Sequence, residues 1–84
     1  MTRDMNPTTN PTLKHATDLI RAGKKHQASV MLAKFIQDHP ASEHAWHILS
    51  YALDDQEQQI YALHRTLEIN PKNKFARQRL AKIT

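Results

Sequence analysis

The chain has 84 residues, a formal net charge of +4, one glycine, four prolines and no cysteine. This length supports one small core, and the lack of cysteine excludes both disulfides and thiolate metal sites. The first residues lack the apolar run of a signal peptide, and no stretch approaches the ~20 apolar residues of a membrane span. We therefore expect a cytoplasmic protein without a membrane segment.

The charge is distributed unevenly along the chain. Residues 1–40 carry six Lys or Arg against three Asp or Glu, residues 41–70 carry one against five, and residues 71–84 carry five against none. Such asymmetry can steer a charged partner or attract the ends of two molecules to one another. Ala, Leu, Gln, Lys and Glu are abundant and no alternating β-branched run occurs, which predicts an all-α fold.

The first predicted elements are a leader and a helix. Residues 1–11 contain Asn, Thr and Pro with hardly any hydrophobic periodicity, which predicts a flexible leader. A helix is predicted over about residues 12–22, because apolar residues recur there at the spacings of one helix face, at Leu13, Ala16, Leu19 and Ile20. Gly23 stands where a left-handed C-cap residue belongs, so the helix should end there.

Two further helices are predicted on either side of Pro40. The first covers about residues 24–38 and stops there because a residue that precedes proline disfavours the α region. Its apolar stripe consists of Ala28, Met31, Leu32, Phe35 and Ile36. The second begins at Glu43, with Ser42 as its N-cap. Its inward residues are predicted to be Ala45, Trp46, Leu49, Ala52 and Leu53.

The last two helices follow similar signals. Asp55 and Gln58 predict a capping box at the start of a helix over residues 56–69. Its apolar positions are Ile60, Leu63, Leu67 and, in part, Tyr61 and Ala62. A turn at Pro71 then precedes a closing helix over residues 74–83, with Phe75, Ala76, Leu80 and Ile83 as its apolar positions. Helices joined by such short connections must pack as antiparallel neighbours.

The turn at Pro40 and the helix after it have a second copy around Pro71. The two prolines are 31 residues apart, and superposing them aligns Ala45 with Ala76 and Leu49 with Leu80. We therefore interpret the chain as a repeat protein with a single domain over residues 12–84. Its parts are units of about 9–42 and 43–73 and the closing helix at 74–83.

These spacings resemble the tetratricopeptide repeat, whose pattern is W-x2-L-G-x2-Y, then A-x3-F, then P. The second unit carries Trp46-x2-Leu49-Ser50-x2-Leu53, and the first carries Ala28-x3-Leu32 before Pro40. The second unit is shorter than the family pattern in the turn between its helices. Gln59 stands where a small residue is expected, which predicts looser packing there. The resemblance implies antiparallel helix pairs stacked as a short tetratricopeptide-like α-solenoid of about five helices, with a related α-solenoid as the alternative.

Signature residues of such a repeat fold the protein, because stacked helix pairs cannot bury their faces alone. We assign this structural role to Ala16, Leu19, Ala28, Leu32, Pro40, Trp46, Leu49, Pro71 and Leu80. Recognition should then involve the positions that the signature leaves free.

In the tetratricopeptide family, the first helix of each pair lines a concave groove that takes an extended or helical peptide. The resemblance therefore implies a non-enzymatic scaffold for protein binding, whose partner is a protein or peptide. Carried over by register, the partner-binding positions are Leu13, Thr17, Ile20, Arg21, His44, His47, Tyr51, Asp54, Phe75, Gln78 and Lys82. Tyr51 with His47 and His44 at helical spacing could form an amphipathic platform, and the alternative is that these are ordinary solvated positions.

Other kinds of function have less support from the residues. His44 and His47 share a helix face, but no third ligand completes a zinc site, so we expect neither a metal nor a cofactor. No phosphate-binding loop or nucleophile elbow occurs, so we expect no enzyme activity. The basic residues Lys72, Lys74, Arg77, Arg79 and Lys82 favour, as an alternative, salt-dependent binding of nucleic acid or of an acidic partner. Self-association, for example as a homodimer, is a third alternative, because about three repeats are normally needed for stability.

Overall fold

The computed structural model describes residues 10–84, so most of the predicted leader lies outside the described residues. Its five helices are α1 (Pro11–Arg21), α2 (Lys25–Asp38), α3 (Glu43–Ala52), α4 (Gln56–Ile69) and α5 (Lys74–Ile83). No strand occurs between residues 10 and 84, and the predicted all-α fold is confirmed. The last two helices have the predicted bounds, whereas α1 begins one residue before the predicted start, at Pro11.

Side-chain caps explain where four of the helices begin. Asn10 Oδ1 accepts hydrogen bonds from the backbone N–H groups of Thr12 at 3.0 Å and Leu13 at 3.2 Å, and Pro11 fits the first helical position. The other three caps are Ser42, Asp55 and Asn73, each of which accepts from the N–H group three residues later. These bonds satisfy backbone donors that a helix leaves unpaired in its first turn.

Gly23 forms the turn between α1 and α2. Its φ of 82° lies in the left-handed region, where glycine is favoured. The Gly23 N–H donates to the Ile20 carbonyl at 3.0 Å and the Lys24 N–H to the Leu19 carbonyl at 2.8 Å, which is the Schellman pattern. This C-cap confirms the prediction and turns the chain so that α2 packs antiparallel to α1.

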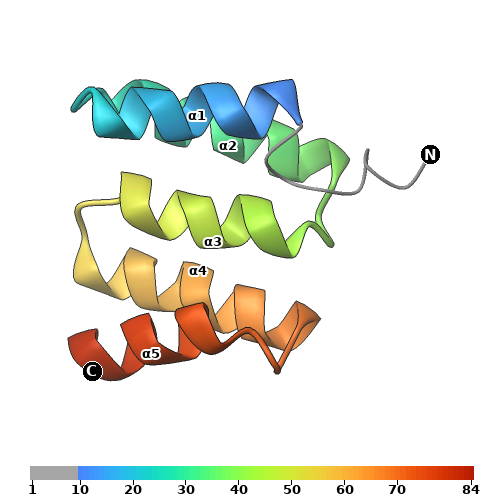
Figure 1. Cartoon of the computed structure of the whole chain (residues 1–84), viewed down its shortest axis with the longest axis vertical. Coiled ribbons are helices and arrows are strands. Elements are labelled where there is room, and N and C mark those ends of the chain that lie inside the picture. The colour runs from blue at the N-terminus through green and yellow to red at the C-terminus, as the bar shows by residue number, and fades with distance from the viewer. Residues whose placement is uncertain (1–9) are drawn as a thin grey trace.

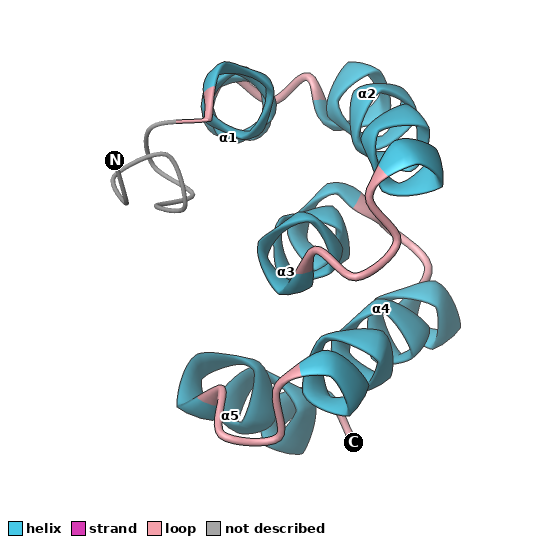
Figure 2. Ribbon diagram, turned by 90° about the vertical axis from the view of Figure 1, so that its right-hand side faces the viewer, coloured by secondary structure: helices cyan, strands magenta, loops and turns pink. Residues whose placement is uncertain are grey.

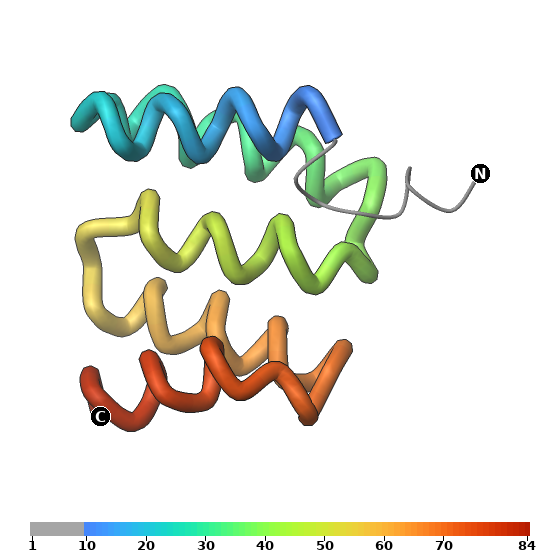
Figure 3. The backbone as a smooth tube through the Cα atoms, in the orientation of Figure 1, coloured from blue at the N-terminus to red at the C-terminus, as the bar shows by residue number. Residues whose placement is uncertain are grey.

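The helices form a stack in which consecutive helices are neighbours (Figure 1; Figure 3). Its core is built mainly from alanine and leucine: Leu13, Ala16, Ala28, Leu32, Ile36, Ala45, Ala52, Ala62, Leu63 and Ala76. Alanine at the contacts lets neighbouring helix backbones approach closely. The two buried polar side chains, Ser50 and Thr66, donate hydrogen bonds to the carbonyls of His47 and Ala62 at 2.6 and 2.9 Å.

The stack is curved. Seen along the helices, α1, α3 and α5 lie on one side and α2 and α4 on the other (Figure 2). The side between α1 and α5 is concave, with α3 at its centre. The first helix of each pair therefore lines the inner face of the curve, and the second helix lies on the outer face.

Two residues have a contact or an exposure that the repeat register did not predict. The Gln59 side-chain amide donates to the Leu53 carbonyl at 2.7 Å and closes the short turn between α3 and α4. Phe75 was counted among the apolar positions of α5, but it is 64% exposed. Within α5 only Ala76 is buried, because no further helix covers this end of the stack.

Candidate functional site

A groove runs between α1 and α3 on the concave side. It consists of two adjoining hollows of about 350 and 400 Å³ that share Thr17, Arg21 and Ile48. We call it the α1–α3 groove. Seven of the eleven predicted partner-binding residues line it: Leu13, Thr17, Ile20, Arg21, His44, His47 and Tyr51. Leu13 is only 4% exposed, so it forms the floor.

The other four predicted positions lie outside this groove. Asp54, in the turn after α3, pairs with Lys25 at 3.5 Å. The remaining three, Phe75, Gln78 and Lys82, are exposed on α5. They belong to the helix that borders the concave face opposite α1 (Figure 2).

Tyr51 lies at the centre of the concave face, where neighbouring side chains hold its ring in place. Its ring centroid lies 5.5 Å from that of His47. The Arg79 guanidinium lies over the Tyr51 ring, with Cζ 4.0 Å from the centroid, and its Nη2 donates to the Ser50 carbonyl at 3.0 Å. This cation–π contact and hydrogen bond connect α5 to α3. They also restrict the motion of the Tyr51 ring.

Arg79 was predicted only as part of the basic C-terminal segment and not among the concave-face positions. The available signal was its register, because superposing Pro71 on Pro40 places Arg79 at the position of Ile48, which lines the α1–α3 groove. The sequence spacing does not show that the Arg79 side chain points toward Tyr51. That direction depends on the distance between α3 and α5, which only the packed stack sets.

His47 lies in an electrostatic environment that favours its neutral form. Burial is the main cause that lowers its pKa from the ordinary 6.5, and the positive charges of Arg79 and His44 lower it further, while Glu43 opposes them. The His47 Nε2 atom is buried and has no hydrogen-bond partner within residues 10–84. The His47 imidazole therefore stays neutral at neutral pH and keeps an unused hydrogen-bonding atom.

Charged residues on α1 border the groove. Asp18 accepts from Lys14 Nζ at 3.2 Å and lies 4.0 Å from Arg21. One carboxylate thus faces two cations, and both ion pairs are exposed enough to be weak. This border carries a net positive charge.

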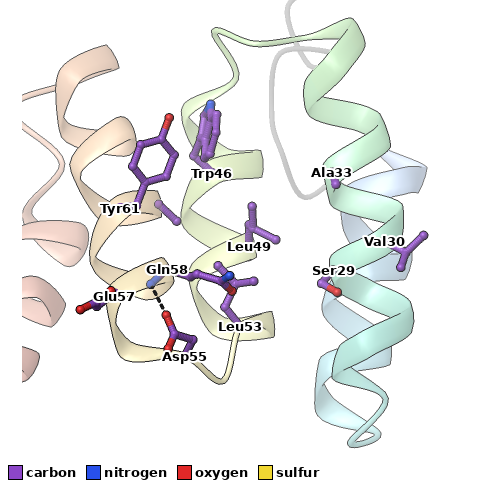
Figure 4. Close-up of a pocket in the computed structure, with 11 residues that line it drawn as sticks. Ser29, Val30, Ala33, Trp46, Leu49, Leu53, Asp55, Glu57, Gln58 and Tyr61 are labelled. Carbon is purple, nitrogen blue, oxygen red and sulfur yellow. Dashed lines mark hydrogen bonds between the residues drawn. The ribbon is translucent and has the colours of Figure 1, made fainter.

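A second groove lies between α2 and α4 on the other side of α3, and the sequence analysis did not predict it. Its volume is about 610 Å³ (Figure 4). We call it the Trp46 groove, after the residue on its floor. The Trp46 indole donates from Nε1 to the Pro40 carbonyl at 3.0 Å and meets the Tyr61 ring edge-on at 5.8 Å. Trp46 therefore both supports the fold, as its signature role predicts, and lines a surface.

The cations of α5 do not form one free patch. Arg79 is turned toward Tyr51, and Arg77 donates to the Pro71 carbonyl. Lys74 Nζ lies 5.7 Å from the centroid of the Phe75 ring. Lys72, in the turn before α5, and Lys82, near the end of α5, are both exposed.

The described part of the chain contains neither a cluster of metal ligands nor a membrane-spanning helix. No three His, Asp or Glu side chains there converge on a point where they could hold a metal ion. None of the helices α1 to α5 is long and apolar enough to cross a membrane. No protein family, curated protein or solved structure matches this chain.

Proposed function

We propose that this chain is a non-enzymatic, tetratricopeptide-like module that binds a peptide segment of a partner protein on its concave face. The observation that supports this most is the α1–α3 groove, which brings together seven positions that the repeat register had selected. Its apolar lining from Ile20 and Ile48, with a few polar groups between, is typical of binding sites.

Tyr51 is the centre of the proposed site. Arg79 and His47 hold its ring in place, so little side-chain entropy would be lost when a ligand packs on it. Tyrosine offers both an apolar ring and a hydroxyl, which explains why it is frequent among the residues that dominate binding energies.

The arrangement around His47 argues against catalysis. Ser50 is the hydroxyl nearest in sequence, but it donates to the His47 backbone carbonyl and not to the imidazole. A histidine that activated a serine would accept from its hydroxyl. We therefore assign His47 to binding.

The test is selection of peptides from a random library with the whole protein, followed by amide chemical-shift mapping. Two exposed tyrosines on opposite faces provide matched variants, Tyr51→Ser and Tyr61→Ser. We expect Tyr51→Ser to weaken binding by about tenfold or more, as for a central interface residue, and Tyr61→Ser to bind like the wild type. Shift changes confined to α2 and α4 would reject the concave site.

Binding of nucleic acid through α5 is the second candidate. It is supported by exposed Lys72, Lys74 and Lys82 and by the absence of acidic residues from residues 71–84. It is weakened by the intramolecular contacts of Arg77 and Arg79. A generic duplex that bound at low salt and dissociated as salt rose would favour it.

A further inference from the structure

The Trp46 groove is an apolar surface that the proposed function leaves unused. Tyr61 and Val30 line it and are 59% and 56% exposed. They are two of the four large hydrophobic residues that are exposed within residues 10–84. The floor between them is formed by Trp46 and Leu49 of α3 and by Leu53, which directly follows α3. Exposed apolar surface of this kind marks interaction sites.

The two ends of the groove differ in chemistry. Trp46 and Tyr61 lie together at one end, and Asp55 and Glu57 lie at the other (Figure 4). No cation is among the residues of the described chain that line it. Arg65 stacks on Trp46 at 5.4 Å, but it pairs with Glu68 at 2.6 Å. The groove therefore suits a ligand with an apolar ring at one end and a positive charge at the other.

The distance between the two ends sets the spacing that the ligand needs. The floor begins at Trp46 and ends at Leu53, one residue beyond the end of α3, so it is about 10 Å long at the helical rise of about 1.5 Å per residue. On a second helix, residues seven apart lie on the same face and are separated by the same distance. A helix with an aromatic residue and, seven residues later, a lysine would match both ends.

Helix α5 of this chain has that arrangement. Phe75 is the most exposed large hydrophobic residue described, and Lys82 follows seven residues later on the same face. Between them, Gln78 is neutral and exposed. The described residues that line the groove include two acids, Asp55 and Glu57, and no cation, whereas residues 71–84 carry five cations and no anion. The charges of the two surfaces are therefore complementary.

We propose that the Trp46 groove binds α5 of a second copy of this chain, with Phe75 against the Trp46–Tyr61 pair and Lys82 beside Asp55 and Glu57. In one molecule α5 borders the concave side whereas the groove lies on the side of α2 and α4 (Figure 2). The contact therefore joins two different surfaces, and its repetition gives an open chain of molecules. The proposal does not rest on peptide binding, because the α1–α3 groove stays uncovered in such a chain.

The first test is sedimentation velocity of the whole protein over a range of concentrations. We expect a mass that grows past the dimer as concentration rises. Raising salt from about 0.1 M to about 1 M shortens the Debye length from about 10 to about 3 Å and should weaken assembly by roughly 1.5- to fivefold. Trp46, the only tryptophan, should shift its emission to the blue as the groove is covered. A protein that stays monomeric throughout overturns the proposal.

Two variants test whether the contact is head to tail. Val30→Gln with Tyr61→Gln removes the groove, and Phe75→Gln removes the ring of α5. All three positions are more than half exposed, so folding should be retained, and circular dichroism checks the helix content. Each variant alone should remain monomeric. Mixed in equal amounts, they should form a dimer and nothing larger, because one groove and one α5 remain intact. A mixture that stays monomeric overturns the proposal, as does a groove variant that assembles like the wild type.

A charge reversal tests the acidic end. Glu57→Lys should weaken assembly, and adding Lys82→Glu to the same chain should restore it, because the pair then attracts again. Asp38→Lys is the matched control, since Asp38 is an exposed acid at the far end of α2, and it should assemble as the wild type does. Equal effects of Glu57→Lys and Asp38→Lys, or no restoration in the double variant, would contradict the pairing.

Discussion

Replacing Arg79 tests the contact that connects α5 to the concave face. Arg79→Gln removes both the positive charge over Tyr51 and most of the hydrogen bonding to Ser50. Arg79→Lys keeps the charge but loses the planar guanidinium that stacks and donates at a fixed angle. Comparing the two variants separates the effect of charge from the effect of shape.

The expected loss of stability follows from the two contacts. A cation–π contact contributes about 0.5–2 kcal/mol, and a hydrogen bond with a charged donor about 1.5–3 kcal/mol. Arg79 is only half-buried, which places its contribution near the lower limits. We expect Arg79→Gln to lower the free energy of unfolding by about 1–2 kcal/mol and Arg79→Lys by about 1 kcal/mol. In a domain of this size, 1 kcal/mol corresponds to a Tm change of roughly 4–8 °C.

The same variants should act differently on His47. The charge of Arg79 is one of the causes that lower the His47 pKa, so Arg79→Gln should raise that pKa. Burial is the larger cause and remains, so the pKa should stay below 6.5. Arg79→Lys should leave the His47 pKa lower than Arg79→Gln does, because the charge is retained.

Thermal unfolding and NMR titration of the histidine ring protons measure both effects. If the two variants were as stable as the wild type, the contacts with Tyr51 and Ser50 would contribute nothing. If Arg79→Gln destabilised the protein but left the His47 pKa unchanged, Arg79 would act by packing alone. Either result would contradict the electrostatic account of the concave face.

Three further predictions concern pH, the core and the first turn. The folded state lowers the His47 pKa below 6.5, so the unfolded state binds the proton first as pH falls. The free energy of unfolding should therefore drop from about pH 7 downward and level off below the folded-state pKa of His47. Urea titrations should show that this loss of stability is reduced in His47→Gln and retained in His15→Gln. Leu32→Ala removes a fully buried side chain and should lower the free energy of unfolding, measured by chemical denaturation, by about 2–5 kcal/mol. A decrease below about 1 kcal/mol would contradict the assigned core. Gly23→Ala should lower the free energy of unfolding by about 1–2 kcal/mol, because Gly23 has a φ of 82°, although nothing lies within 4 Å of the added methyl group. Gly23→Asn should lower it less. Equal stability of the wild type and both variants would contradict the left-handed cap.

Local signals were sufficient to predict the helices. Ser42 and Asp55 cap helices where the sequence placed them, and Gly23 ends α1 by the expected bonds. Each of these features depends on residues within one turn of each other, so their side-chain chemistry can be evaluated without the rest of the fold. The groove positions on α1 and α3 came from the resemblance to the tetratricopeptide repeat, which implies that the first helix of each pair faces the concave side.

The features that the sequence did not predict depended on distances between helices. The Trp46 groove exists because α2 and α4 leave apolar residues between them uncovered, and no spacing within either helix reports that gap. Asp54 pairs with Lys25, which is 29 residues away in sequence, and spacing within one helix could not predict this contact. Gln59 looked too large for its position, but it is accommodated by a bond to the Leu53 carbonyl across the turn.

The amino-acid pattern alone established the all-α fold and the positions of the helices, because helix propensity, caps and periodicity act over a few residues. The concave orientation of one face was expected only from the resemblance to the tetratricopeptide repeat. The tertiary structure decided which side chains meet: Arg79 with Tyr51 and Ser50, Trp46 with Tyr61, and Phe75 with no covering helix. These contacts join residues from different helices. Their geometry depends on how closely the helices pack, and that is set by the whole core at once.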